Sequence, residues 1–532
     1  MSTAPTARPP ATVPPVVPPL HGPWPSPSPW WRSWPGPGRP AALGTLLSIG
    51  AAAVIAALSL PLDRAGLGWL IAAAAGAAAL TVARAIPERR PAGLPGPLPA
   101  RRVGPAWDRY CWAGATLALL AVGTFRSAGW LFLLCLAVAT LTSTLALAGG
   151  RSMRAIAAGY LIGPIASFRA LGWVARGLAR VRRPGGAASG VRIVATLAVS
   201  IALLVVFGAL FASADTAFAD VLSSVIPAID AGTVARWIFV LGVTVPLLGG
   251  AAFLRAAPPD LSKLDRTEGR KANRLEWAIP LGLLVLLFAG FVAVQLTVLF
   301  GGNQHVRNTD GLTYADYARG GFWQLSFVTA LTLVVLAGAA RWAPRRTTTD
   351  RVLLRSILGA LAILTLVVVA SALLRIQVYT DTYGLTRLRL LVACCEGWFG
   401  LVLIMVLVAG VWIRASWLPR AALAAGVLAL LGLAVANPDA LIAGHNIRQN
   451  RTIDLEYLGS LSPDAVPAVA KYGQGSTRAC VLGQIATQLD EPDDWRQWNL
   501  GRERAREVLT GTSATSASCP WPPAALTSPP GR

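Results

Sequence analysis

Residues 389–413, RLLVACCEGWFGLVLIMVLVAGVWI, decide the fold class of this chain. Apart from Arg389 and Glu396, the stretch contains no charged side chain. A helix needs about 20 mostly apolar residues to cross the hydrocarbon core of a bilayer. The stretch therefore predicts a membrane-spanning helix.

Similar apolar stretches recur on both sides of it, and together they predict an all-α, polytopic bundle of about eleven transmembrane helices. A small helical extracytoplasmic segment follows the last of them. The predicted spans are residues 41–61, 67–86, 107–125, 128–148, 192–213, 236–255, 276–300, 321–340, 353–374, 389–413 and 417–435.

Positive charge alternates between the gaps that separate these spans. The gaps before every odd-numbered span, with the span ends beside them, hold 30 of the 47 Lys and Arg, whereas the intervening gaps hold eight. Because basic loops stay on the cytoplasmic side, we predict a multi-pass plasma-membrane protein. Its N-terminus would be cytoplasmic and its C-terminus extracytoplasmic.

Composition supports this class and excludes others. Charged residues make up 14% of the 532 residues, against about a quarter in soluble proteins. The net charge of +22 is spread over inward loops, where anionic headgroups attract it, so we expect no nucleic-acid partner. The expected partners are the lipid bilayer and a membrane or extracytoplasmic protein.

The ends of the chain differ in composition from the predicted transmembrane domain, residues 41–435. Residues 1–40 are rich in proline, which favours an extended, disordered cytoplasmic tail; a docking strip for a proline-binding partner is the alternative. Trp34 in this tail is a candidate for contact with the headgroup layer. Residues 436–510 carry repeated helix-start signals such as Asn437-Pro438, and residues 511–532 read as a disordered tail.

Two further segments do not fit the pattern of spans. Residues 155–183 contain a short apolar run broken by Pro164, followed by arginines at near-helical spacing. This pattern favours a helix lying on the inner membrane surface. Residues 214–233 carry three aspartates and no basic residue, so we place them outside as a short helix or re-entrant turn.

No sequence motif indicates a metal, a cofactor or a hydrolytic centre. The three histidines are far apart, and HExxH, CxxC, GxSxG and P-loop motifs are missing. Four of the six cysteines lie inside predicted spans, whereas Cys480 and Cys519 lie in the segment placed outside. An oxidising compartment would allow these two to form a disulfide.

Polar residues gather in three predicted outward segments, which we interpret as one polar basin. Residues 303–324 end in a helical face with Asp316 and Gln324, and Arg319 could pair with Asp316. Residues 437–457 include His445 and Arg448. The candidate binding residues are Asp316, Arg319, Gln324, Asp381, Arg387, Arg389, Glu396, His445 and Arg448.

Glu396, inside the tenth span, is the strongest single candidate. Arg389 falls in the first turn of span ten, where the helix dipole disfavours a cation, so we expect a fixed partner. Glu396 lies on the same face about 10 Å deeper. A carboxylate at this depth costs a few kcal/mol unless it is paired or faces a polar cavity. A structural ion pair and a role in binding or proton transfer both stay open.

The motifs TYADYARGGFWQL, YGLTRLR, NPDALIAGHNI and IDLEYLGSLSPDAVPAV, in this order along the chain, carry a resemblance to a known family. The chain resembles the bacterial multi-pass membrane proteins grouped as domain of unknown function 4173, related to 4153. The resemblance covers roughly residues 110–510. It implies the membrane architecture and implies no catalytic residue.

Three functions are compatible with these features. We expect a non-catalytic membrane protein whose outward polar basin binds an extracytoplasmic ligand, a lipid or a partner protein. The first alternative is a secondary transporter that uses Glu396 as its intramembrane carboxylate. The second is an outer-face transferase acting on a lipid-linked substrate, with Asp316, Asp381 or His445 as base.

Overall fold

The computed structural model describes most of the chain as helices. The described residues are 34, 36–85, 106–181, 231–261, 273–300, 314–344, 347–412, 416–449, 454–511 and scattered positions between 196 and 218. Their regular elements are all helices, and eight of these are long and apolar enough to cross a membrane. The all-α, multi-pass fold class is therefore confirmed.

Ten of the predicted spans coincide with described helices. The predicted fifth span, 192–213, and the segment 214–233 lie largely outside the described residues. The helices are α1 (Leu43–Ser59), α2 (Leu67–Ala85), α3 (Ala106–Phe125), α4 (Gly129–Ala148), α8 (Ala231–Ala256), α10 (Arg274–Phe300), α12 (Tyr314–Trp342), α13 (Thr348–Tyr383), α14 (Arg387–Trp412) and α15 (Leu418–Ala436).

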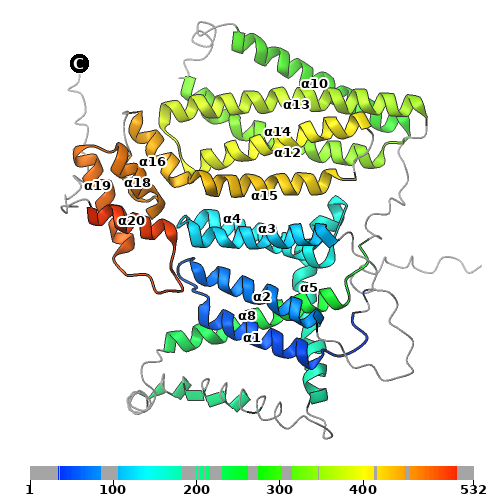
Figure 1. The fold of residues 1–532 in the computed structure, drawn as a ribbon. Coiled ribbons are helices and arrows are strands. Elements are labelled where there is room, and N and C mark those ends of the chain that lie inside the picture. The colour runs from blue at the N-terminus through cyan, green and yellow to red at the C-terminus, as the bar shows by residue number, and fades with distance from the viewer. Residues whose placement is uncertain are drawn as a thin grey trace, which may run out of the picture.

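The helices form two bundles that lie side by side (Figure 1). The N-terminal bundle contains α1 to α4, α8 and the additional helix α5 (Met153–Val181), and the C-terminal bundle contains α10 and α12 to α15. Helix α15 packs against α14 on one side and against α3 and α4 on the other. Val427 and Leu433 of α15 share a buried cluster with Leu119 and Leu131, so apolar packing joins the two bundles here.

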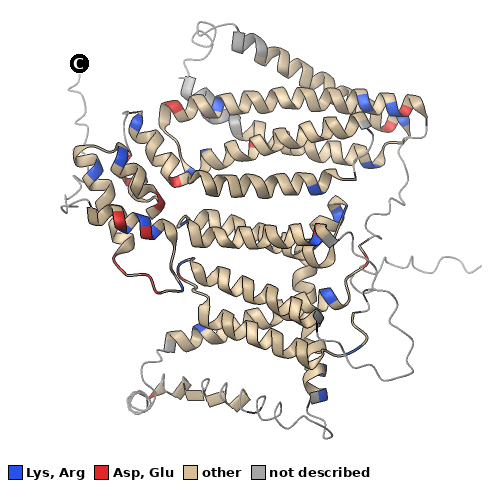
Figure 2. Ribbon diagram, viewed as in Figure 1, with Lys and Arg blue, Asp and Glu red and all other residues tan. Residues whose placement is uncertain are grey.

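Charged residues concentrate at the ends of the helices and in the C-terminal segment (Figure 2). Arg420 at the start of α15 pairs with Asp108 at the start of α3 and donates to the carbonyl of Gly150, just after α4. Arg274 of α10 likewise pairs with Asp350 of α13. The ends that the charge pattern predicts to be inward therefore lie at one end of the molecule.

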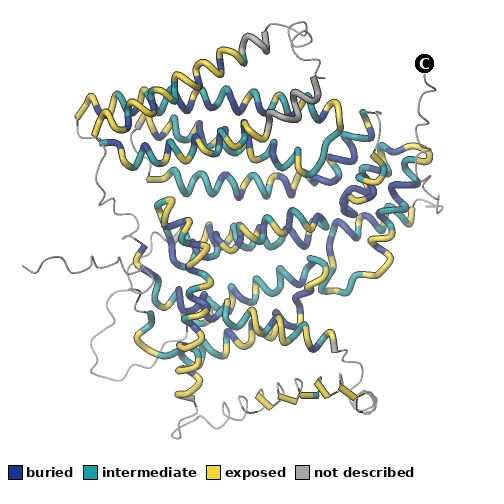
Figure 3. The backbone as a smooth tube through the Cα atoms, turned by 180° about the vertical axis from the view of Figure 1, so that it is seen from behind, coloured by how far each residue is buried: buried dark blue, intermediate teal, exposed yellow. Residues whose placement is uncertain are grey.

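Many residues on the outer sides of the bundles are exposed (Figure 3), and large apolar residues are among them. Leu287 is 68% exposed, Phe327 72% and Leu331 65%. Soluble proteins rarely expose apolar surface of this extent, and lipid chains are its natural environment. The chain is a multi-pass membrane protein.

Helix α5 runs across the other helices of the N-terminal bundle (Figure 1). Along its length, Gly159 lies against Leu141 of α4, Gly250 of α8 lies against Ser167, and Gly177 lies against Ala41 just before α1. Successive turns of α5 thus contact α4, α8 and the residue before α1, each near the same end of the bundle. Although its length and composition would permit a span, this course agrees with the predicted helix at the membrane surface.

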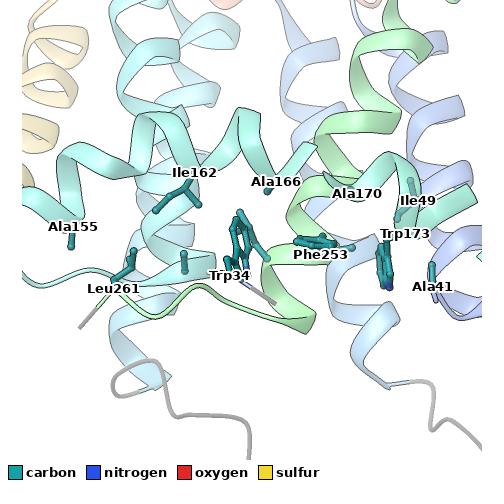
Figure 4. Close-up of a cluster of buried hydrophobic side chains, with 13 residues drawn as sticks. Trp34, Ala41, Ile49, Ala155, Ile162, Ala166, Ala170, Trp173, Phe253 and Leu261 are labelled. Carbon is teal, nitrogen blue, oxygen red and sulfur yellow. The ribbon is translucent and has the colours of Figure 1, made fainter. Parts of the chain in front are cut away.

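The segment before α1 is fastened to α5 and α8 (Figure 4). Trp34 is only 3% exposed and packs edge-on against Phe253 at 5.4 Å. Its Nε1 donates to the carbonyl of Ala257 at 2.8 Å, and the guanidinium of Arg169 lies 5.2 Å from its ring. The expected contact of Trp34 with headgroups is therefore wrong, because the ring is enclosed by protein.

Residues 437–511 form a group of short helices at one end of the molecule, which we name the C-terminal cap (Figure 1). Its apolar core includes Ile442, Leu461, Val466 and Ile485. Its elements are α16 (Pro438–Arg448), α17 (Leu455–Gly459), η1 (Pro463–Ala465), α18 (Val466–Tyr472), α19 (Gly475–Ala486), η2 (Thr487–Leu489) and α20 (Leu500–Gly511).

The cap turns sharply away from the last span at Asn437. This residue has φ 57°, in the left-handed region that asparagine tolerates better than most residues. Its side-chain oxygen accepts a hydrogen bond from the amide of Ala440, and Pro438 occupies the first turn of α16. The predicted helix start at Asn437-Pro438 is confirmed.

Candidate functional site

An ion pair fastens the C-terminal cap to the C-terminal bundle. Arg387 at the start of α14 faces Asp439 in the first turn of α16. Nε lies 3.1 Å from Oδ1 and Nη2 lies 2.6 Å from Oδ2, a bidentate geometry. The side chain of Asp439 is fully buried, whereas that of Arg387 is 31% exposed. This partner offsets the unfavourable place of Arg387 at the positive end of the helix dipole.

Asp439 also reaches the N-terminal bundle. Its Oδ1 accepts a hydrogen bond from Nε1 of Trp130 in α4 at 3.3 Å. Its Oδ2 accepts from the backbone amide of Ser462 in the cap at 2.9 Å. One carboxylate therefore joins both bundles to the cap.

A second buried carboxylate, Asp464, holds the start of α4. Its Oδ2 accepts from the backbone amides of Ser127 at 2.7 Å and Ala128 at 3.1 Å. An anion at the N-terminal end of a helix satisfies free amide groups and interacts favourably with the helix dipole. Asp464 thus caps a membrane helix from a segment more than 300 residues further along the chain.

Two polar residues near α20 complete the attachment to the N-terminal bundle. The side-chain amide of Asn499, fully buried, donates to the carbonyls of Gly123 at 2.8 Å and Arg126 at 2.9 Å. Arg502 forms a buried ion pair with Asp493 and donates to the carbonyl of Ala65 at 3.1 Å. The cap therefore closes over three helix-to-helix loops.

Burial and hydrogen bonding shift the two carboxyls in opposite directions. Burial by itself raises the pKa of Asp439, but the hydrogen bonds and charge of Arg387, with Ser462, outweigh it and hold the pKa below its ordinary value of 3.8. Burial raises the pKa of Asp464 above 3.8, and its bonds to Ser127 offset this only in part. Only Asp439 thus gains from being ionised in the fold.

The stability of the cap should depend on acid through Asp439. Because its pKa is lowered in the fold, its contribution is present above about pH 4 and is lost as the pH falls through the folded value. Asp464 has the opposite sign: the cost of ionising it appears as the pH rises through its raised pKa. We expect the unfolding midpoint of the cap to fall steeply below about pH 4.

An Asp439→Asn variant tests this dependence. The variant should start from a lower midpoint at pH 7 and lose most of the decline below pH 4. Asp464→Asn, which keeps an oxygen for Ser127 and Ala128, should keep that decline. Thermal unfolding in detergent between pH 3 and pH 7 measures both, and an unchanged acid profile in Asp439→Asn would refute the assignment.

The structure brings together two of the three segments of the predicted basin. The side chain of Asp381 accepts a hydrogen bond from the side-chain amide of Gln449 at 3.3 Å. The side chain of Asn446 accepts from the backbone N–H of Leu385 and donates to its carbonyl. Arg387 is held by Asp439. These contacts join residues 375–389 to α16. Two of the candidate binding residues, Asp381 and Arg387, are therefore bonded to other residues of the protein.

The other basin candidates are more scattered. Arg448 is exposed and lies 5.1 Å from the ring of Tyr472, and His445 is half-buried with its Nε2 enclosed and unbonded. Gln324 is exposed on α12. Asp316 and Arg319 belong to α12, but their side chains lie outside the described residues, so their predicted pairing stays a prediction.

The expected pairing of Arg389 with Glu396 is wrong. Arg389 turns toward the loop, where it donates to the carbonyls of Tyr383 and Gly384 and lies 4.3 Å from the ring of Tyr379. The helix dipole and three local partners favour this position over one buried in the bundle. Glu396 is consequently left without an ion pair.

Glu396 is enclosed in the C-terminal bundle. It has no exposed surface, and neither carboxyl oxygen makes a hydrogen bond of standard geometry; the Ser326 hydroxyl of α12 is the polar group that faces it. On α14 it belongs to a buried face with Val392, Gly400 and Leu403. Nine residues separate it from the start of α14 at Arg387, so it lies about 13 Å from the cap end.

Other polar side chains lie at a similar depth in this bundle. Gly400 lies against Val369 of the antiparallel α13, so Glu396, one turn earlier, is about level with Ser371. The hydroxyl of Ser371 donates to the side-chain oxygen of Gln295 in α10. Helices α10, α12, α13 and α14 thus each place a polar residue in one layer, which we name the polar layer: Gln295, Ser326, Ser371 and Glu396.

The described residues contain no cluster of histidine, cysteine, aspartate or glutamate that could hold a metal ion. Cys480 is buried and disulfide-bonded, whereas the cysteines of the helices, Cys111, Cys135, Cys394 and Cys395, are free. The proposed partner Cys519 lies outside the described residues, and this pairing stays a prediction.

The fold and these contacts define a polytopic α-helical membrane protein with a helical cap held by buried polar groups. The chain belongs to the family described as "Domain of unknown function (DUF4153)", whose model matches residues 114–472. The match supports the related family 4153, while membership in 4173 is not shown. No curated protein and no solved structure matches the chain significantly.

Proposed function

We propose that this protein is a secondary transporter in which a proton bound at Glu396 is the coupling ion. The observation that carries the proposal is a fully buried carboxyl inside a span, with no counter-ion among the residues that the structure describes. An ionised carboxylate there costs several kcal/mol. Glu396 therefore stays neutral while the bundle is closed, and it releases its proton when water or a cation reaches it.

The surroundings of Glu396 favour a cycle of this kind. The polar layer supplies hydroxyl and amide groups from three further helices at the same depth. The nearest titratable neighbour along α14 is Cys395, and Arg375 on α13 lies about one turn closer to the cap. Because α15 provides the main packing between the two bundles, one bundle could tilt against the other with little loss of contact.

Binding at the outward face is the second candidate function. The convergence of residues 375–389 and α16 favours it, together with the exposed Arg448 and the unbonded Nε2 of His445. Two of the candidate binding arginines count against it, because Arg387 is already paired with Asp439 and Arg389 already lies against the ring of Tyr379. An outer-face transferase gains no support, since Asp381 is bonded to Gln449.

The proposed orientation keeps the N-terminus in the cytoplasm and the cap outside. Helix starts at Arg274 and Thr348 share the end opposite the cap, as the alternation of basic gaps requires. Glu396 would then lie nearer the outer surface and would receive its proton first from the extracytoplasmic side.

Accessibility of residue 396 from each side of the membrane tests the proposed function. Glu396→Cys is made in a background where Cys111, Cys135, Cys394 and Cys395 are alanine. A charged, impermeant thiol reagent is then applied to right-side-out and to inverted vesicles. We expect modification from both sides, because a coupling site must open alternately to each compartment.

Leu119→Cys is the control, since Leu119 is fully buried in α3 of the N-terminal bundle, outside α14. This cysteine should be protected from both sides. Protection of residue 396 from both sides would identify a purely structural carboxyl. Access only from the outer side would contradict transport and favour a binding site at the outward face.

A further inference from the structure

Helix α5 has three distinct faces. The packed face carries Ile162, Ala166, Ala170 and Trp173 against the N-terminal bundle. Roughly opposite lies an exposed apolar stripe, with Leu161 58%, Phe168 75% and Leu171 48% exposed. The spacing of seven and three residues places these three side chains on one side of the helix.

Arginines follow one edge of this stripe. Arg154, Arg176 and Arg180 are exposed; at about 100° per residue, Arg154 and Arg176 fall between the apolar stripe and the packed face, whereas Arg180 lies in the last turn of the helix. None of the three forms an ion pair within the described part of the chain. Arg169, by contrast, donates a hydrogen bond from Nη2 to the backbone carbonyl of Trp34 at 2.6 Å.

The level of α5 in the bilayer follows from its contacts. It lies against residues near the ends of α4 and α8 and beside Ala41, which precedes α1. Helix ends of a multi-pass protein lie at the headgroup layer. An apolar stripe beside arginines at this level matches a lipid surface, where acyl chains border phosphate groups.

We propose that the exposed side of α5 is a binding surface for anionic phospholipids of the adjacent leaflet. Phe168, Leu161 and Leu171 insert among the upper acyl chains. Arg154, Arg176 and Arg180 contact the headgroup phosphates. This inference does not depend on proton transfer at Glu396, which lies in the other bundle.

Lipid retention by the full-length protein tests this surface. The protein is placed in nanodiscs of phosphatidylcholine with a minor share of phosphatidylglycerol, and retained lipids are counted by native mass spectrometry. Wild type should retain phosphatidylglycerol preferentially. Replacing Arg154, Arg176 and Arg180 by Gln should weaken that preference by about fivefold per arginine.

A matched triple variant controls for charge alone. Lys471, Arg478 and Arg504 of the C-terminal cap are replaced by Gln, and the preference should be unchanged. An equal loss in both triples, or no loss in the α5 triple, would overturn the proposal. Displacement of the lipid by free inorganic phosphate would also overturn it, since that result indicates a simple anion site.

A fluorophore at residue 168 gives an independent readout that does not depend on the arginines. Phe168→Cys, in the background where Cys111, Cys135, Cys394 and Cys395 are alanine, is labelled with an environment-sensitive dye. The emission should shift to the blue and be quenched by lipids with spin labels near the headgroup. A dye at Arg504→Cys should emit as in water, and aqueous emission from residue 168 would contradict insertion.

Discussion

Replacing Asp439 by Ala should loosen the C-terminal cap by about 3 kcal/mol. The substitution leaves Nε1 of Trp130 and the amide of Ser462 without an acceptor and removes the partner of Arg387. Breaking a buried ion pair costs about 3–5 kcal/mol, and the partial exposure of Arg387 places the expected value at the lower end. Backbone hydrogen exchange in α16 and α17 should accelerate about 100-fold.

Variants at Arg387 sharpen this prediction. Arg387→Gln strands a buried carboxylate and should cost at least as much as Asp439→Ala. The double variant Arg387→Met, Asp439→Leu should cost less than the sum of the single changes, because neither charge is then left unpaired. Arg448→Gln, an exposed cap residue, should leave exchange within about twofold of wild type. Additive losses in the double variant would contradict the pairing.

The apolar helices were predictable from the sequence because they depend on local composition. Apolar length decides which segments form long helices, while the orientation in the membrane and the position of α5 at its surface stay predictions. These signals act over tens of residues, so one sequence contains them completely.

The residues that hold the cap were missed because their partners are remote in sequence. Asp464 caps α4 over 337 residues, and Asn499 reaches Gly123 over 376. The sequence Ser462-Pro463-Asp464 is typical of a helix start, but nothing in it indicates that Asp464 caps a second, remote helix. Asp439 was visible as one charge in a crowded segment, and its pairing with Arg387 required the fold.

The error at Arg389 has a specific physical origin. The spacing of seven residues places Arg389 and Glu396 on one face of α14, which favours an arginine side chain that reaches inward. Carbonyls at the end of α13 and the ring of Tyr379 lie closer and remain accessible to water. Desolvating a guanidinium to reach Glu396 would cost more than this local arrangement.

Neutralising the buried carboxyls Glu396 and Asp439 should have very different effects on stability. A neutral carboxylic acid in the bundle costs far less than a carboxylate, so Glu396→Gln should change stability by less than about 1 kcal/mol. Asp439→Asn should cost several times more, because Asp439 is ionised and paired. The contrast between two buried carboxyls follows from one having a counter-ion and the other having none.

Infrared spectroscopy of the protein in lipid at pH 7 distinguishes a protonated from an ionised Glu396. The difference spectrum between wild type and Glu396→Gln should contain the carbonyl band of a protonated carboxylic acid, absent from the variant. The difference between wild type and Asp439→Asn should contain carboxylate bands instead. Carboxylate bands at pH 7 in the Glu396 difference would show an ionised side chain and contradict the account.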